Sequence, residues 1–371
     1  MADNVISKQR IEEIDIIKAI AIILMVVGHG GAPFTQFVYL FHMAVFFIAS
    51  GYTFRTDNSD SVLSVKRFIQ RKFGQLWVPF FLWNALFTLL HNVFVKVNVY
   101  TDNSAILDYV KGNYIGATDY LDVPQMITNI VIGLWFSSDE QMCGAFWFLK
   151  ILFCISVGYC ILEFIFNKFK YDLKIIQTII SIVFLFIGYM FSLKQNIFHG
   201  LAQVLSYYCL FHLGRLLGEK RYRIACWKGK EHVATIAISV SALFACNNIG
   251  TISLASNSYK NPLFLLVTSF YGWCLLYSIS YFVKKIEWLR YMLLVIGKRT
   301  LSIVEMHFLA FKLVALVVTY VYGLPRFCIA AFPNLYGDRG LWWIAYTIVG
   351  VAIPILVRLI YEKIRGIVVA I

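Results

Sequence analysis

The chain has 371 residues, of which 60% are apolar, 17% aromatic and 14% charged, and its formal net charge is +13. These proportions exclude a soluble domain with a polar surface, because about a quarter of the residues in a typical soluble domain are charged. Many apolar runs approach the ~20 residues that a helix needs to cross a bilayer. The sequence therefore predicts an all-α, polytopic membrane protein.

The apolar runs predict a bundle of about ten membrane-spanning helices. No linker, charge block or repeat divides the chain, so we expect residues 1–371 to form a single integral-membrane domain with no appended soluble domain. The expected spans cover residues 14–33, 36–54, 75–96, 144–166, 175–193, 199–218, 233–250, 262–283, 300–321 and 341–360.

Basic residues gather in the loops that would share one side of the membrane with the two termini. The positive-inside rule then places both termini and the basic loops in the cytoplasm. The excess of positive charge is an orientation signal, and nucleic acid is not an expected partner. The first span has no small-residue cleavage site before it or within it, so we expect a retained helix and not a signal peptide.

The first span carries the strongest functional signal, because ionisable residues inside a membrane mark functional sites by default. Lys18 and His29 are eleven residues apart, which puts them within about 20° of one helix face and about 16 Å apart along it. Asp15 can hold the Lys18 ammonium by an i,i+3 contact. A neutral imidazole suits proton removal from a hydroxyl near neutral pH. The alternative is a structural histidine within the bundle.

His42 lies near the start of the second span and, like His29, in its outer half. The two histidines could be neighbours across the tight turn that contains Pro33. His42 would then be an orienting or second acid/base partner of His29, or else a structural residue bonded to a backbone carbonyl. Farther along this span, Ser50 and Gly51 are expected to allow close helix packing.

Glu305 and His307 in the ninth span are two residues apart, so they point in different directions on a helix. Glu305 needs a partner inside the bundle, and Lys150 or Lys312 is a plausible counter-ion. Such an ion pair can be structural or catalytic.

The long outer segment 97–143 contains an apolar stretch, residues 126–136, that is too short to span and is expected to be re-entrant or interfacial. The eight cysteines show no CxxC pair and no metal-ligand spacing, so no metal is expected. Cys143 and Cys328 could both face outside and form a disulfide.

Five stretches, in order, resemble the acyltransferase-3 family of bacterial integral-membrane O-acyltransferases, in the fucose 4-O-acetylase-like branch. The first is the pair Lys18 and His29, similar to the family's basic-x10-His element. The others are Phe41-His42-Met43 through Ser50-Gly51-Tyr52, Arg67 and Arg71-Lys72 leading to Pro79 and Trp83, Phe146-Trp147-Phe148-Leu149, and Gly297-Lys298-x-Thr300-Leu301-x-Ile303 with His307. The chain departs from the family pattern at Ala44, Val304 and Glu305, where proline, tyrosine and an apolar residue are usual.

The resemblance implies an O-acetyltransferase of the bacterial cytoplasmic membrane. Its donor substrate would be cytoplasmic acetyl-CoA, and its acceptor a hydroxyl of a cell-surface or lipid-linked saccharide. His29 would be a general base or would itself be acylated, with His42 as its partner. The expected binding residues for the CoA phosphates are Lys18, Arg67, Lys298 and Arg299, and the expected supporting residues are Asp15, Glu305, His307 and Trp147.

Two of these assignments have a plainer alternative, since Lys298 and Arg299 also suit anchoring at the cytoplasmic surface. A rival function is a proton-coupled transporter or flippase of a lipid-linked or small substrate, which would use the same ionisable residues. The absence of an inverted repeat in the sequence speaks against it. A purely structural membrane partner is the third and weakest alternative.

Overall fold

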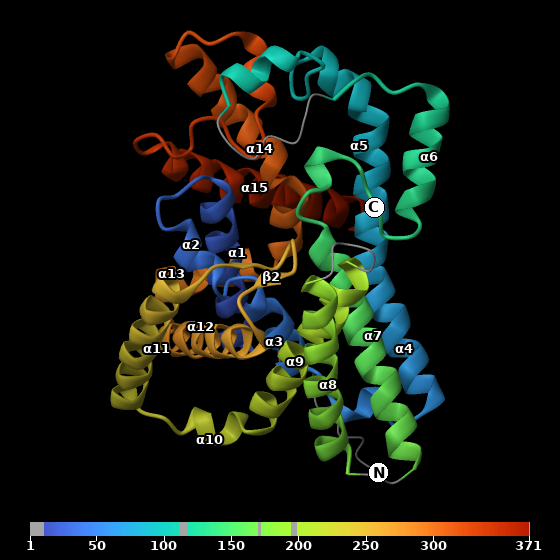
Figure 1. The fold of residues 1–371 in the computed structure, drawn as a ribbon, viewed down its shortest axis with the longest axis vertical. Helices are drawn as coiled ribbons and strands as arrows, with labels where there is room; N and C mark the ends of the chain where they lie inside the picture. The colour runs from blue at the N-terminus through green and yellow to red at the C-terminus, as the bar shows by residue number, and fades with distance from the viewer. Residues whose placement is uncertain (1–10, 111–117, 170–171, 194–198, 371) are drawn as a thin grey trace.

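The protein is described by a computed structural model over residues 11–110, 118–169, 172–193 and 199–370. The basic residues of the first ten positions, which contribute to the predicted orientation, lie outside this part. The α-helices are α1 Glu12–His29, α2 Thr35–Tyr39, α3 Ala44–Tyr52, α4 Val62–Lys72, α5 Val78–Lys96, α6 Val123–Gly133, α7 Trp147–Lys168, α8 Leu173–Leu193, α9 His199–Glu219, α10 Arg221–Ala225, α11 Gly229–Ile249, α12 Pro262–Val283, α13 Glu287–Gly297, α14 Thr300–Val321 and α15 Trp342–Ala370 (Figure 1). Residues Phe73–Trp77 join α4 to α5 as a π-helix, and the strands β1 Ile252–Ser253 and β2 Ser258–Tyr259 form an antiparallel pair.

The predicted all-α, polytopic membrane bundle is confirmed. Eight helical segments of the described residues are long and apolar enough to cross a membrane, and they correspond to eight of the expected spans. The other two expected spans also form helices, α1 and α9, but these are more polar. In α1 the reason is a cluster of charge in its first two turns, formed by Glu12, Glu13, Asp15 and Lys18.

Helix α1 lies inside the bundle, against α3, α12, α13, α14 and α15 (Figure 1). Its first turn is fixed by ion pairs of Glu12 with Arg290, at 2.6 Å, and of Glu13 with Lys284. The Arg290 guanidinium holds the pKa of Glu12 below its ordinary value. At the other end, Asn334 Nδ2 donates a hydrogen bond of 2.8 Å to the carbonyl of His29, one of the last carbonyls of the helix. Both ends of the helix that carries Lys18 and His29 are therefore anchored.

The second expected span corresponds to the segment Thr35–Tyr52, whose helix is interrupted by a turn. It divides into α2 and α3, and residues 40–43, which include His42, form a turn between them. Irregular backbone at membrane depth occurs where it is buried in protein or lines a cavity. Beyond the break, α3 packs closely on α9, because a Cβ at Gly51 would lie 1.8 Å from the Phe211 carbonyl oxygen. The expected role of Gly51 in close packing agrees with this contact.

The outer segment forms α6, which runs antiparallel along α5. Asn92 Nδ2 donates to the Leu121 carbonyl at one end of the contact, and Trp77 Nε1 donates to the Leu134 carbonyl at the other. Trp77, the last residue of the π-helix, and Asn92 on α5 are fifteen residues apart, or about 22 Å along the helix. The chain then returns without regular helix until Glu140 meets His91. The path is that of a hairpin that runs along α5 and back.

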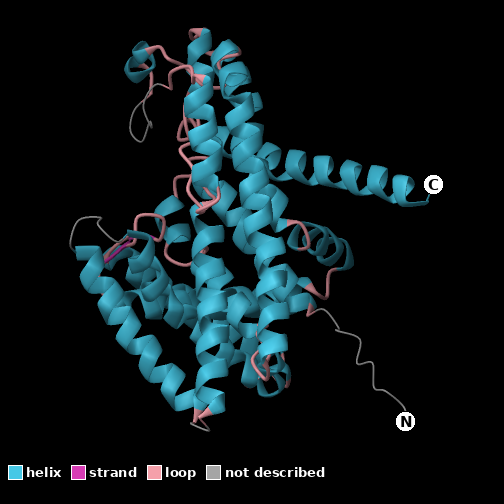
Figure 2. Ribbon diagram, turned by 90° about the vertical axis from the view of Figure 1, so that its right-hand side faces the viewer, coloured by secondary structure: helices cyan, strands magenta, loops and turns pink. Residues whose placement is uncertain are grey.

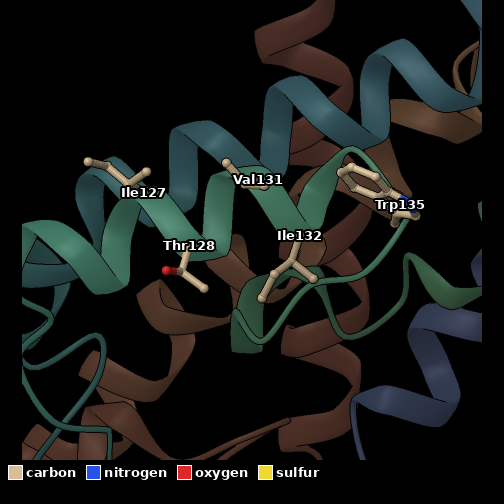
Figure 3. A pocket seen from close by; sticks show the side chains of 5 residues that line it. All are labelled: Ile127, Thr128, Val131, Ile132 and Trp135. Atoms are coloured by element: carbon tan, nitrogen blue, oxygen red, sulfur yellow. The ribbon is translucent and has the colours of Figure 1, made fainter.

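The outward face of α6 is apolar and forms a shallow hollow with no titratable side chain. Figure 3 shows its five lining residues, Ile127, Thr128, Val131, Ile132 and Trp135.

At the end of the chain, α15 extends well away from the body of the bundle (Figure 2). Both cysteines that the sequence offered for a disulfide, Cys143 and Cys328, are buried free thiols.

Candidate functional site

A cavity of about 110 Å³ brings together segments that are distant in the sequence. It lies between the C-terminal end of α1, the α2–α3 break, the segment that leads into α7, and the loop of β1. Its walls are mostly apolar, with two imidazoles, a phenol, an indole and a hydroxyl among them. The lining residues are Met25, His29, Tyr39, His42, Met43, Ala145, Trp147, Ile252, Ser253, Leu254 and Ala255.

His29 reaches this cavity from the last turn of α1, and its closest polar contact is with α14. Its Nδ1 lies 3.0 Å from His307 Nε2, and the two rings stack at 5.2 Å between centroids. His307 is fully buried, and Phe308 stacks on His29 at 5.0 Å. The sequence offered His42 as the orienting partner of His29, but the ring that His29 contacts by a hydrogen bond belongs to His307.

His42 faces the same cavity from the α2–α3 break. Its Nδ1 donates to the Val38 carbonyl at 3.0 Å, so the unprotonated nitrogen of the neutral ring is Nε2. Within the described residues this Nε2 has no hydrogen-bond partner, and no hydrogen bond joins His42 to His29. The two histidines therefore share a cavity as separate groups, each with one ring nitrogen committed elsewhere.

Tyr39 was not singled out from the sequence, although it lines the cavity together with the two histidines. Its ring lies 5.0 Å from that of His42. It also contacts α1 at Gly28, where a Cβ would come within 2.3 Å of Tyr39 Cε1. The contact joins two separate helices, so the sequence around His29 does not reveal it.

One wall of the cavity is covered by Trp147, at the start of α7, and by the β1 loop. The loop is held by α9, because Gln203 Nε2 donates to the Leu254 and Ala255 carbonyls, both at 2.9 Å. Tyr207 OH donates to the Leu254 carbonyl at 2.7 Å. This cover places backbone rather than charge opposite the histidines.

Lys18 lies near the opposite end of α1 and forms an ion pair of 2.8 Å with Asp15, as the i,i+3 spacing predicted. The Lys18 side chain keeps 25% exposure, whereas that of Asp15 is buried at 3%. Lys72, at the end of α4, lies within electrostatic range of Lys18. Gly297 contacts the backbone of Asp15 directly, which brings the next residue, Lys298, to the same end of α1.

The other two cations expected at this end are placed differently. Arg299 forms an ion pair of 2.6 Å with Glu362 on α15, so its guanidinium is already engaged. Arg67 is exposed on α4, one turn before Arg71. The sequence grouped four cations at this end; in the structure Lys298 follows a residue that contacts Asp15, and Lys72, which was not among the four, lies within electrostatic range of Lys18.

Glu305 lies on α14 outside the cavity, and neither lysine suggested as its counter-ion pairs with it. Lys312 is buried and donates instead to the carbonyls of Ala330 and Ala331, at 3.0 and 2.9 Å. Those carbonyls end a short 3₁₀-helix, where a cation is favoured by the helix dipole. Arg358 on α15 lies within electrostatic range of Glu305, and Trp83 on α5 lies near enough to interact with its carboxylate. Spacing in the sequence does not reveal either neighbour.

No group of three or more metal-ligating side chains is arranged to hold an ion in the part of the chain that the structure describes. Residues 11–359 match the family described as an acyltransferase domain, of the acyltransferase-3 type. No curated protein and no solved structure matches the chain. The family match covers every residue of the cavity and of the cation cluster.

Proposed function

The chain belongs to the acyltransferase-3 family and is a membrane acyltransferase, and from its site we propose that it is an O-acetyltransferase. In this proposal it moves acetyl from cytoplasmic acetyl-CoA to a hydroxyl of a cell-surface or lipid-linked saccharide. Its place is the bacterial cytoplasmic membrane, with both termini in the cytoplasm. Acetyl-CoA is a substrate here, and the chemistry asks for no metal.

The observation that carries the proposal is the division of α1 into two functional ends. Lys18 lies at one end, within electrostatic range of Lys72 and at the same end of α1 as Lys298, and His29 lies in the cavity wall about 16 Å away along the helix. Phosphates favour a cluster of cations, and the thin pantetheine arm of CoA is about as long as this separation. A donor held by its phosphates at Lys18 can therefore present its thioester to His29.

The cavity supplies the groups that acyl transfer to a hydroxyl needs. The acceptor oxygen bonds to the thioester carbonyl carbon while its proton passes to His29. The C–S bond then breaks, and His29 returns the proton to the CoA thiolate. In the alternative route, acetyl passes first from CoA to His29 and then from His29 to the acceptor hydroxyl. In either route His42 is a second acid/base group, and Trp147 offers the acceptor sugar an aromatic face.

The test is transfer of radiolabelled acetyl from acetyl-CoA by purified protein to glycolipids extracted from a bacterial envelope. Label in a saccharide, lost in His29→Ala by about 10²–10⁴-fold, is the expected result. His212→Ala is the matched control, because His212 is also buried in the bundle but bonds to Tyr159 and Thr178, away from the cavity.

A transporter or flippase would move its substrate without transferring label. If glycolipids cross proteoliposome membranes in a proton-dependent way while no label is incorporated, the acetyltransferase proposal fails. If the wild type and His29→Ala incorporate label equally, the protein is an acetyltransferase but His29 takes no part in the reaction.

A further inference from the structure

The hydrogen bond between His29 and His307 fixes where the protons of both rings lie. His307 Nδ1 lies 2.8 Å from the carbonyl oxygen of Ile303 and 3.2 Å from that of Val304. A carbonyl oxygen only accepts, so Nδ1 of His307 carries the proton and donates it. In a neutral His307, Nε2 is then an acceptor.

The proton position on His307 determines that on His29. Because His307 Nε2 accepts, His29 Nδ1, 3.0 Å away, must be the donor. The unprotonated nitrogen of His29 is therefore Nε2, the one ring nitrogen not engaged by α14. A neutral pair is also what the surroundings favour, because neither ring forms an ion pair with a carboxylate of the described residues, and a buried, unpaired charge is costly.

We propose that His307 is a positioning residue that holds His29 in the tautomer able to take a proton at Nε2. The inference rests on the proposed function and gives His307 the place that an orienting carboxylate has in a Ser-His-Asp triad. When the acceptor hydroxyl gives its proton to His29 Nε2, the charge that appears on His29 is stabilised through Nδ1–H by the His307 lone pair. His307 itself neither gains nor loses a proton.

The packing around the pair is consistent with a fixed geometry. Phe308 contacts both rings, at 5.0 Å from His29 and 4.0 Å from His307, and Phe311 meets His307 edge-on at 5.7 Å. His307 is bonded at both nitrogens, so rotating its ring would break a bond on each side. In the alternative tautomer of His29, its Nδ1 would carry a lone pair that faces the lone pair of His307 Nε2. The hydrogen bond between the two rings would then be lost.

Three substitutions separate this role from simple support of α14. His307→Gln can place an amide oxygen near the position of Nε2 and accept from His29. His307→Asn is shorter and reaches only the position of Nδ1, near Ile303. His307→Leu removes both bonds. We expect kcat to fall by about 10²-fold or more in the Leu and Asn variants, to stay within about 10-fold of wild type in Gln, and the acetyl-CoA KM to change little.

A second measurement does not depend on the activity. Solid-state NMR of protein carrying nitrogen-15 histidine, reconstituted in lipid, reports which ring nitrogen of His29 is protonated. His29→Ala identifies its signals. We expect protonated Nδ1 in the wild type and in His307→Gln, and Nε2-protonated or mixed forms in His307→Leu.

The two measurements distinguish the possible failures. If His29 is protonated at Nε2 in the wild type, or if Asn retains more activity than Gln, the positioning role is overturned. If the expected tautomer is observed but no acetyl is transferred, the proposed reaction is wrong and the geometry of the pair stands.

Discussion

The backbone of Asp15 lies directly against Gly297, so that a Cβ at position 297 would come within 2.0 Å of the Asp15 carbonyl oxygen. This contact joins the end of α13 to the first turns of α1. Because Asp15 also holds Lys18, the ammonium of Lys18 and the start of the Lys298 segment are brought to one place. The donor end of the proposed site is therefore built on a backbone contact that only glycine allows.

Substitutions of Lys18 should affect the donor and not the acceptor. Lys18→Gln removes the charge and should raise the acetyl-CoA KM, whereas Lys18→Arg keeps the charge and adds donors. The measurement is initial rate against each substrate in turn. An effect of Lys18→Gln confined to the acceptor KM would move Lys18 out of the donor site. Lys230→Gln is a suitable control, because it also removes a positive charge. The Lys230 side chain is 83% exposed beside Glu231 and lies far from Lys18 in sequence.

Gly28→Ala should reshape the cavity between the histidines. The new methyl group would meet Tyr39 Cε1 at 2.3 Å, so the ring must move. A shift of about 1 Å next to reacting groups can reduce the rate by about 10²-fold. In a Tyr39→Ala background the same substitution should have little further effect, because the clash is gone. Equal effects in both backgrounds would show that Gly28 acts through something other than Tyr39.

Glu140→Ala should destabilise the fold through His91. Both ring nitrogens of His91 face acceptors, the Glu140 carboxylate at 3.0 Å and the Asp119 carbonyl at 3.0 Å, so the ring donates from both and is charged. Removing one member of a buried ion pair costs about 3–5 kcal/mol. Thermal unfolding in detergent measures the change. Glu219→Ala is the control, because its ion pairs with Arg215 and Lys174 are partly exposed and should each contribute about 1 kcal/mol or less. Similar Tm values for the two variants would contradict the buried ion pair.

The predicted orientation can be tested by labelling single cysteines in intact cells. Cys226 is the exposed native cysteine of the described residues and is replaced first. Cysteines at Ser61 and Lys228 should resist a membrane-impermeant thiol reagent, and cysteines at Asn103 and Asp338 should react. All four positions are exposed in the structure, so protection reports the side of the membrane and not burial. Labelling at Ser61 from outside would show that the orientation is the opposite of the predicted one. Acetyl-CoA would then have no cytoplasmic route to Lys18.

Much of the helical framework could be predicted, because each span is a long apolar run whose position depends on local sequence alone. The i,i+3 contact of Asp15 with Lys18 was equally local. The break at residues 40–43 was not predicted, since the run through the second span is uninterrupted in hydropathy. There His42 bonds to the Val38 carbonyl, and although the sequence offered a carbonyl bond as one alternative for His42, it did not indicate a break in the helix at this point.

The site was harder to predict than the helices, because it depends on contacts between helices that are distant in the sequence. His307 was recognised as a candidate, but its spacing from Glu305 said nothing about which helix it would meet. Lys312 was expected to neutralise a carboxylate and caps carbonyls instead. Lys72 and Tyr39 were missed as site residues because nothing in their own segments distinguishes a cation or a phenol at a site from one at a surface or in a core.

The close contact between α3 and α9 also determines which parts of the site can move independently. A Cβ at Gly51 would lie 1.8 Å from the Phe211 carbonyl oxygen, and one at Gly214 would lie 2.0 Å from that of Ile48. Two backbones in such contact cannot slide past each other without bringing larger residues into the gap, so α3 and α9 form one rigid body. Because α9 also holds the β1 loop through Gln203, the cover of the cavity travels with the helix that follows His42. In the proposed reaction, an acceptor that approached from that side would meet the loop held at Leu254 or the indole of Trp147, which belongs to another helix.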